Sequence, residues 1–227
     1  MKSSYAGPMS ESEVAAVTVS AKKARGRGRP RLSAEQRDES ERRQEIVRAA
    51  ARLFRERGFA ATSTRDIAAA VGLQSGSPFY YFKSKTALLH TVMHDGMEQA
   101  FASQQRALDA LAADASAHQH LRVLVRNHLE VLLGPDSDFI PVMLYEWRSL
   151  SAEQHADVAV LKDRYEAQWM PVLAGLHETG ALRAHPQVAR LLIFGALNWS
   201  AKWFRPGGEL SLDELTDQAL LLFAGED

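Results

Sequence analysis

Residues 63–85 constrain this chain more than any other stretch, because they read as two short helices joined by a tight turn. Ser63 or Thr64 offers a hydroxyl that can cap the first helix, and apolar residues follow at helical spacing. Gly72 can adopt the left-handed conformation that ends a helix. A second helix is predicted to begin directly after the turn, at about residue 74. The stretch is therefore predicted to form a helix-turn-helix.

The second of these helices begins with small and hydroxyl side chains, which allow a backbone to approach the edge of a DNA base pair. Lys83 and Lys85 follow the helix and are predicted to meet phosphates. The residues of this region that we expect to contact DNA are Thr64, Arg65, Gln74, Ser75, Gly76, Ser77, Tyr80, Tyr81, Lys83 and Lys85.

The stretch resembles the DNA-binding domain of the TetR/AcrR transcriptional regulators, whose motif runs T-x-x-[DE]-I-A-x-x-x-G-[VL]-x-x-G-[ST]-x-[YF]-x-[YH]-F-x-[SN]-K. Pro78 stands where an aliphatic residue is usual. Phe79 stands where a phosphate-bonding tyrosine is common, which moves that expected role to Tyr80 or Tyr81. An ordinary helical hairpin with an aromatic core is the alternative interpretation. The matching positions are Ile67, Ala68, Gly72, Leu73, Gly76, Ser77, Phe79, Tyr81, Phe82, Ser84 and Lys85.

The resemblance implies an all-α protein, with an N-terminal three-helix helix-turn-helix DNA-binding domain followed by a helical ligand-binding and dimerisation domain. The expected parts are a disordered basic N-terminal arm over residues 1–32, the DNA-binding domain over 33–85, and the effector-binding and dimerisation domain over 86–227. It further implies a homodimer, joined through the last two helices, on a palindromic operator of double-stranded DNA. Such a regulator is most often a repressor that a small hydrophobic effector releases.

Residues 22–31, KKARGRGRPR, hold six basic residues and no acidic one. Their core, Arg27-Gly28-Arg29-Pro30, resembles an AT-hook, so Arg27, Arg29 and Arg31 are expected to enter the minor groove of A/T-rich DNA. A solvated tail that attracts phosphates without sequence preference is the alternative. If this arm carried the function by itself, the protein would be an architectural A/T-rich DNA-binding protein.

The net charge of −1 hides an asymmetry between the two parts of the chain. Residues 1–95 hold 17 Lys and Arg against 10 Asp and Glu, whereas residues 96–227 hold 10 against 18. A basic N-terminal part is expected where that part meets a polyanion. No apolar run approaches the roughly 20 residues of a membrane helix, and no signal-type segment begins the chain. We therefore expect a cytoplasmic protein with no membrane partner.

Catalytic and metal-binding patterns are missing from the sequence. There is no cysteine, and no G-x-S-x-G, P-loop, dinucleotide-binding glycine pattern or H-E-x-x-H is present. His90 and His94 are one helical turn apart, but no third metal ligand is evident. We expect no enzyme, no cofactor and no metal site. An enzyme that acts on a hydrophobic substrate is the alternative hypothesis.

The C-terminal half carries all four tryptophans, which could line a cavity for a flat or long apolar ligand or could form an aromatic core. The segments YEWRSL at 145–150 and NWSAKWFRPGG at 198–208 are similar to segments of the regulators that respond to fatty acyl-CoA. Arg148 or Arg205 could then pair with a carboxylate or phosphate. Control of efflux by aromatic drugs is the alternative. The candidate ligand residues are Tyr145, Trp147, Arg148, Trp169, Asn198, Trp199, Trp203 and Arg205.

Capping and helix-breaking residues predict the remaining helices, with Ser151 as the cap of one and Ser211 with Glu214 at the capping-box spacing of the last. No strand pattern is present. The last two helices carry apolar stripes suited to either a core or a dimer interface. The predicted helices run from about residue 33 or 34 to Arg57, and over Thr86–Ala112, Ala117–Leu133, Phe139–Leu150, Ala152–Thr179, Pro186–Arg205 and Leu212–Ala224. The stripes comprise Val188, Leu191, Leu192, Gly195 and Trp199, with Leu212, Leu215, Ala219, Leu222 and Phe223.

Overall fold

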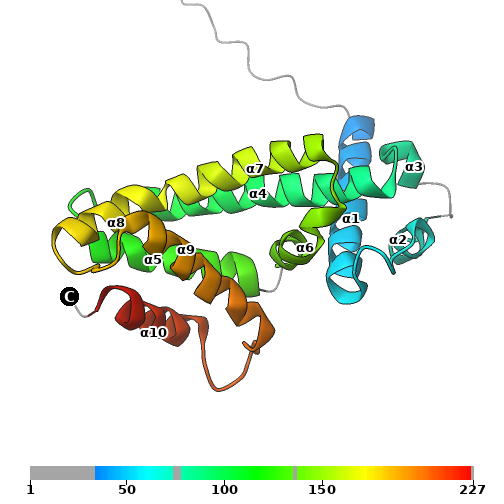
Figure 1. The fold of residues 1–227 in the computed structure, drawn as a ribbon. Coiled ribbons are helices and arrows are strands. Elements are labelled where there is room, and N and C mark those ends of the chain that lie inside the picture. Colours follow the sequence, from blue (N-terminus) through cyan, green and yellow to red (C-terminus); the bar gives the residue numbers. More distant parts are fainter. Residues whose placement is uncertain (1–33, 74–77, 135–136, 226–227) are drawn as a thin grey trace, which may run out of the picture.

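The computed structural model describes residues 34–73, 78–134 and 137–225. These residues form helices and no strand (Figure 1), which confirms the predicted all-α class. Within the same ranges, no helix is long and apolar enough to cross a membrane.

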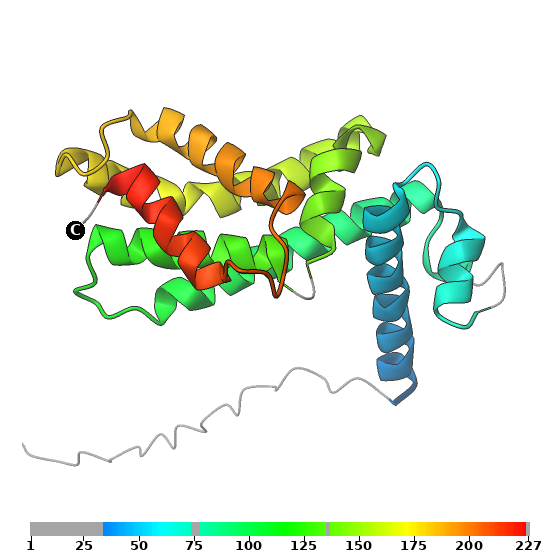
Figure 2. The same cartoon turned by 90° about the horizontal axis from the view of Figure 1, so that it is seen from below.

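The N-terminal helices form one end of the molecule (Figure 2). Helix α1 (Ala34–Arg57) stands beside α2 (Thr64–Ala70) and α3 (Pro78–Tyr81), and α4 (Lys85–Asp109) leads away from them. The predicted bounds of α1 are confirmed, and Gly58 ends it with a φ of +81°. Ile46, Phe54 and Ile67 are buried where α1 meets α2, so the apolar face of α1 supports the helix-turn-helix.

Helices α5, α6 and α7 pack against α4, and α4 runs side by side with α7 along the molecule (Figure 1). Helix α5 lies against α4, α8 and α10, and α6 touches both α1 and α4. In chain order these elements are α5 (Ala117–Leu133), α6 (Phe139–Glu146), η1 (Trp147–Ser149), α7 (Ala152–Ala167), α8 (Trp169–Glu178), α9 (Pro186–Trp199), η2 (Ser200–Lys202) and α10 (Leu212–Ala224).

The predicted caps are in place at α7 and α10. Ser151 accepts a hydrogen bond from the Gln154 N–H (3.3 Å), and Ser211 accepts one from the Glu214 N–H (3.2 Å). The Ser211 backbone N–H in turn donates to the Glu214 carboxylate (2.8 Å), which holds the pKa of that carboxyl below its usual value. These reciprocal bonds satisfy amides that a helix start leaves without partners.

The long helix predicted over Ala152–Thr179 is wrong, because the chain forms two helices that break at Gln168. Pro171 explains the break. Its ring nitrogen has no hydrogen to donate to the Ala167 carbonyl, and its ring clashes with that carbonyl in a continuous helix. Proline is tolerated in the first turn of a new helix, and Pro171 lies in the first turn of α8. The predicted helix over Pro186–Arg205 is likewise shorter, since α9 ends at Trp199 and a 3₁₀ turn follows.

Helices α4 and α6 meet at Gly96, which is buried in α4. A Cβ at this position would lie 2.2 Å from Cγ and 2.7 Å from Cβ of Phe139, closer than any real carbon contact. Glycine therefore lets the Phe139 ring rest directly on the α4 backbone.

Two polar contacts join the C-terminal end of α1 to α6. Arg55 forms an ion pair with Asp138 (2.9 Å), which directly precedes α6. The backbone N–H of Phe59 donates to Oε1 of Glu146 (2.8 Å), the last residue of α6. The two ends of α6 are thereby tied to the segment that carries the helix-turn-helix.

Candidate nucleic-acid interface

The first helix of the helix-turn-helix begins with a capping box. The Ser63 hydroxyl accepts the Asp66 N–H (3.2 Å), and the Ser63 N–H donates to the Asp66 carboxylate (2.8 Å). Hydrogen bonds from Ser63, first from its side chain, hold the pKa of Asp66 below its usual value. The capped start predicted at Ser63 or Thr64 is thus confirmed, with Ser63 as the cap.

The turn after α2 forms as its glycine predicts. Gly72 has a φ of +67°, and the N–H groups of Gly72 and Leu73 donate to the carbonyls of Ala69 (3.2 Å) and Ala68 (2.8 Å). This is a Schellman motif, in which a left-handed residue satisfies the last carbonyls of a helix. Leu73 then packs against the core.

The second helix is described over Pro78–Tyr81, and Pro78 is its first described residue, a position that proline tolerates. The contacts predicted for Gln74, Ser75, Gly76 and Ser77 lie outside the described residues, as do those of Arg27, Arg29 and Arg31 in the arm.

The two tyrosines of α3 differ in exposure. Tyr80 exposes 77% of its surface, whereas Tyr81 is half-buried and packs against the core. Their rings meet edge to face at 5.1 Å. A phenol can donate to a phosphate oxygen, so Tyr80 is the better placed of the two for the role that Phe79 cannot fill.

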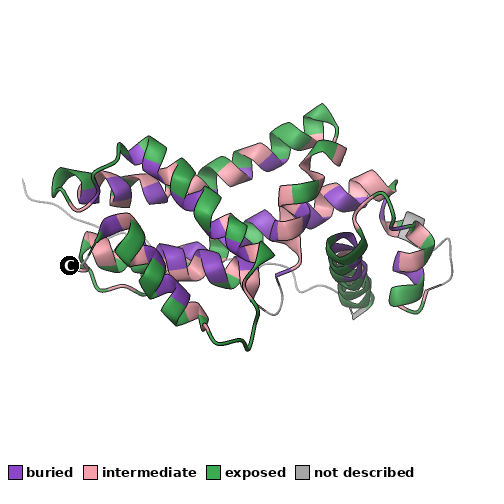
Figure 3. Ribbon diagram, turned by 60° about the horizontal axis from the view of Figure 1, so that its bottom comes forward, coloured by how far each residue is buried: buried purple, intermediate pink, exposed green. Residues whose placement is uncertain are grey.

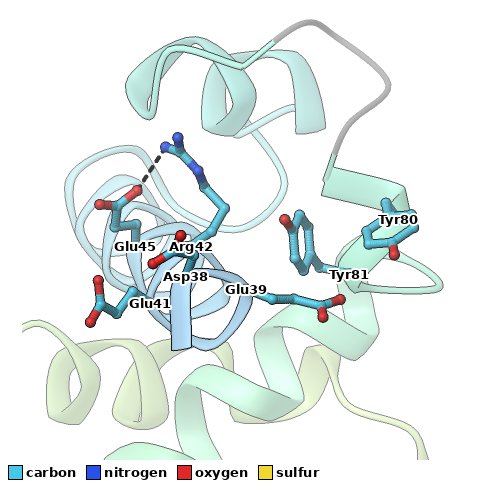
Figure 4. A pocket seen from close by; sticks show the side chains of 7 residues that line it. All are labelled: Asp38, Glu39, Glu41, Arg42, Glu45, Tyr80 and Tyr81. Carbon is cyan, nitrogen blue, oxygen red and sulfur yellow. Dashed lines mark hydrogen bonds and ion pairs between the residues drawn. The ribbon is translucent and has the colours of Figure 1, made fainter. Parts of the chain in front are cut away.

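A groove of about 550 Å³ separates α3 from the first turns of α1 (Figure 4). Four carboxylates line it, from Asp38, Glu39, Glu41 and Glu45, against the single guanidinium of Arg42. That guanidinium pairs with Glu45 at 2.8 Å. The excess negative charge repels phosphates, so DNA is not expected to enter this groove. Tyr80 also lines the groove, and its largely exposed ring is expected to meet a phosphate from the solvent side.

Thr64, Arg65 and Lys83 lie around α2 and α3. Thr64 is half-buried at the start of α2, while Arg65 and Lys83 are exposed. Lys83 has no hydrogen-bond or ion-pair partner among the described residues, which leaves its ammonium available to a phosphate.

Lys85 has a different environment from the one its predicted phosphate contact requires. Its ammonium donates to the carbonyls of Phe59 (2.7 Å) and Thr62 (2.8 Å), and it lies 4.2 Å from the centre of the Phe59 ring. The half-buried side chain thus joins the start of α4 to the α1–α2 loop. The structure gives Lys85 a bracing role inside the domain, and a phosphate contact stays a prediction that requires these bonds to open.

In the C-terminal half, two of the predicted ligand residues, Trp169 and Asn198, belong to a buried polar network. The Trp169 indole N–H donates to Gln104 (2.9 Å), and Gln104 donates to the carbonyl of Tyr165 (2.9 Å). Trp169 is fully buried, so it serves here as core.

His128 lies at the centre of this network, with 2% of its surface exposed. Its Nε2 lies 3.1 Å from Oδ1 of Asn198 and its Nδ1 lies 3.0 Å from the Tyr165 hydroxyl. An amide oxygen only accepts, so Nε2 carries the proton and Nδ1 accepts from Tyr165. Burial lowers the pKa of His128 to about 4, and burial raises the pKa of Tyr165. The ring is therefore neutral at physiological pH.

The other predicted ligand residues are not gathered around this network. Trp147 packs on His155, the exposed Tyr145 ring lies 4.0 Å from the Lys202 ammonium, and Arg148 and Arg205 are exposed. Trp199 and Trp203 expose 64% and 49% of their surface. The four tryptophans thus differ widely in exposure, because helical spacing does not tell which side of a helix faces the core, and their role in ligand binding stays a prediction.

Sequence reasoning missed His128 and Gln104, whose partners lie 37 to 70 residues away along the chain. The available signal was a polar residue at an apolar position: His128 follows Leu121, Leu124 and Val125 on the buried face of α5. Of the histidine pair on α4, His90 contacts Asp157 on α7 (2.8 Å), so this side chain helps join the two helices.

Comparison with known proteins identifies the two halves independently. The family model described as "Bacterial regulatory proteins, tetR family" matches residues 46–92, and the model "Tetracyclin repressor-like, C-terminal domain" matches residues 114–225. The transcriptional repressor KstR2 of Rhodococcus jostii (strain RHA1) is 31% identical over 188 residues, which cover 80% of this chain and 88% of the relative.

Solved structures show the same fold. The structure titled superantigen PfiT is 38% identical with a TM-score of 0.68, over 82% of this chain and 97% of that one. AibR in complex with isovaleryl coenzyme A and operator DNA is 25% identical with a TM-score of 0.73, over 81% of this chain and 98% of that one. The capped α2, the Gly72 turn and both family matches lead to one conclusion: the chain belongs to the TetR family and is a DNA-binding, ligand-responsive transcriptional repressor.

Proposed function

We propose that this repressor binds a palindromic operator as a homodimer and that a small hydrophobic effector, such as a fatty acyl-CoA, releases it. The observation that carries the proposal is the double tie between α1 and α6. Because Arg55–Asp138 and Phe59–Glu146 hold both ends of α6 to the helix-turn-helix, a shift of α6 moves the recognition helix. The basic arm of residues 1–32, the DNA-binding domain of 33–85 and the effector domain of 86–227 are the working parts in this proposal.

The homodimer is supported by exposed apolar residues that form a stripe on α9 and α10. Figure 3 colours the exposed residues of these helices green. Val188, Leu191, Leu192 and Trp199 each expose more than half of their surface and recur at helical spacing on α9. Gly195 is exposed between these residues and has no side chain, which keeps that side of α9 flat. A Cβ at this position would meet nothing within 4 Å. On α10, Leu215 and Ala219 are buried, while Leu221 and Leu222 are exposed. Such a patch marks a contact surface, and a two-fold axis through it would present two recognition helices to two half-sites.

DNA reading is assigned to α3 and the residues before it, and phosphate binding to Thr64, Arg65, Tyr80, Tyr81 and Lys83. The arm adds affinity for A/T-rich flanks through the minor groove. The protein acts on DNA in the cytoplasm and has no catalytic role.

The effector class is supported by the relative AibR, whose structure holds isovaleryl coenzyme A, and by the two segments of this chain that are similar to those of acyl-CoA-responsive regulators. The coupling is a population shift: the effector favours a spacing of the recognition helices that no longer fits both half-sites.

The proposal is tested by selecting bound fragments from a random DNA library with the purified protein. Enrichment of a palindrome whose half-sites lie about one helical turn apart supports the dimeric repressor. The selection is repeated with the six basic residues of 22–31 changed to glutamine. If the palindrome is still enriched and only the A/T preference in the flanks weakens, the helices recognise the operator sequence and the arm recognises the flanks. Enrichment of A/T-rich DNA without a palindrome would favour the architectural alternative.

A further inference from the structure

A hollow of about 510 Å³ lies at the junction of the two halves, where α1, the end of α5 and the segment between η2 and α10 meet. Leu133 comes from α5 and Arg55 comes from α1. Phe204 and Leu210 come from the connecting segment, and Leu212 is the first residue of α10. Its volume falls in the range of small-molecule sites, which occur preferentially at domain interfaces.

The sequence RPGG at 205–208 builds one wall of this hollow. Pro206 and Gly207 occupy the centre of a tight turn, in which Gly207 has a φ of +75° and the Gly208 N–H donates to the Arg205 carbonyl (3.0 Å). Proline followed by a left-handed glycine is the signature of a type II turn. The turn reverses the chain, so that Phe204 before it and Leu210 after it face the same hollow.

The charged and apolar groups that line the hollow suit an anion with an apolar body. The Glu130 carboxylate also lines the hollow, but it is paired with Arg126 (2.6 Å). The remaining charged group is the Arg55 guanidinium, which is two-fifths exposed and pairs with Asp138 (2.9 Å). A guanidinium binds carboxylates and phosphates with paired hydrogen bonds, and the leucines and Phe204 supply an apolar surface beside it.

We propose that this hollow is the effector site, that it takes an amphipathic anion with an acyl body, and that the anion competes with Asp138 for Arg55. The inference rests on the proposed function and assigns its effector to a place. Exchange of partners at Arg55 opens the tie at the start of α6, while the Phe59–Glu146 hydrogen bond at its other end remains. The ligand therefore gains affinity in the state in which the start of α6 has separated from Arg55, which is the differential binding that a population shift requires.

The test measures direct binding by calorimetry, with decanoate and decanoyl-CoA as separate probes, on the full chain and three variants. Leu210→Trp fills the hollow and is expected to weaken binding at least tenfold. Arg55→Gln removes the anchor and is expected to weaken it about tenfold, the scale of one charge-assisted hydrogen bond. Asp138→Asn removes the competing charge and is expected to tighten binding several-fold. Val160→Trp on the exposed face of α7, away from the hollow, is the matched control and is expected to bind as the unaltered chain does.

The probes separate the two sources of the anion. If decanoate binds in this pattern, the effector is a free fatty acid. If only decanoyl-CoA binds, the effector is the thioester. Unchanged affinity in both Leu210→Trp and Arg55→Gln, for a probe that binds the unaltered chain, would overturn the assignment of the site. Operator release by such a probe in all variants would place the effector elsewhere while leaving the proposed function intact. Binding in the expected pattern without operator release would support the site and refute the effector role.

Discussion

Replacing Lys85 with methionine separates two roles for its ammonium group. The structure joins this ammonium to the Phe59 and Thr62 carbonyls, and methionine keeps the length of the side chain while removing both hydrogen bonds. A hydrogen bond to a charged group contributes about 1.5–3 kcal/mol, and water replaces part of it at a half-buried position, so we expect a loss of about 2 kcal/mol for the pair.

For a chain of this length, 1 kcal/mol corresponds to about 2–4 °C in Tm, so Lys85→Met should lower Tm by about 4–8 °C. Calorimetry at a fixed protein concentration measures this shift. The slope of log affinity for DNA against log salt concentration, measured well below Tm, should stay unchanged. Lys83→Met is the matched control, expected to leave Tm unchanged and to lower the salt slope by about 1. A Lys85 variant with normal Tm and a slope lowered by about 1 would refute the bracing role and restore the phosphate contact.

Three further predictions address packing, protonation and assembly. Gly96→Ala places a Cβ against the Phe139 ring and should cost about 1–3 kcal/mol of unfolding free energy, measured by urea denaturation; an unchanged midpoint would refute the close approach of α4 and α6. Burial holds the pKa of His128 near 4 in the folded protein, so between about pH 6.5 and 4 the unfolded chain binds a proton that the folded chain does not. The unfolding free energy should therefore fall as pH drops through this window, by up to about 1.4 kcal/mol per pH unit, and His128→Leu should flatten this part of the curve. Leu192→Asp puts a charge into the exposed stripe of α9 and should convert dimer to monomer in sedimentation while operator affinity falls; a dimer that persists would place the interface elsewhere.

Helix ends were the most predictable part of the fold, because they depend on a few neighbouring residues. Ser63, Gly72, Ser151 and Ser211 each cap or end a helix through bonds within four or five residues, so their roles can be read locally. The break at Gln168 was equally local, but the apolar periodicity of the flanking segments concealed the effect of Pro171.

The direction in which side chains face was much less predictable. Trp169 and Trp199 both lie on apolar stripes, yet one is fully buried and the other is mostly exposed. The difference depends on which helices pack together, and that is decided by contacts between distant residues. Lys85 shows the same limit at the DNA-binding end, since its carbonyl partners lie 23 and 26 residues before it and nothing in its own neighbourhood points to them.

Reciprocity of ligand and operator binding is the most direct test of coupling between the C-terminal domain and the helix-turn-helix. Once a palindromic operator and a binding probe are in hand, the affinity of the protein for each is measured with and without the other. A shared equilibrium between two states requires that the probe weaken operator binding by the same factor by which the operator weakens probe binding, and we expect a factor of about 5 or more. A factor of one in both directions would show that the C-terminal domain does not control the helix-turn-helix.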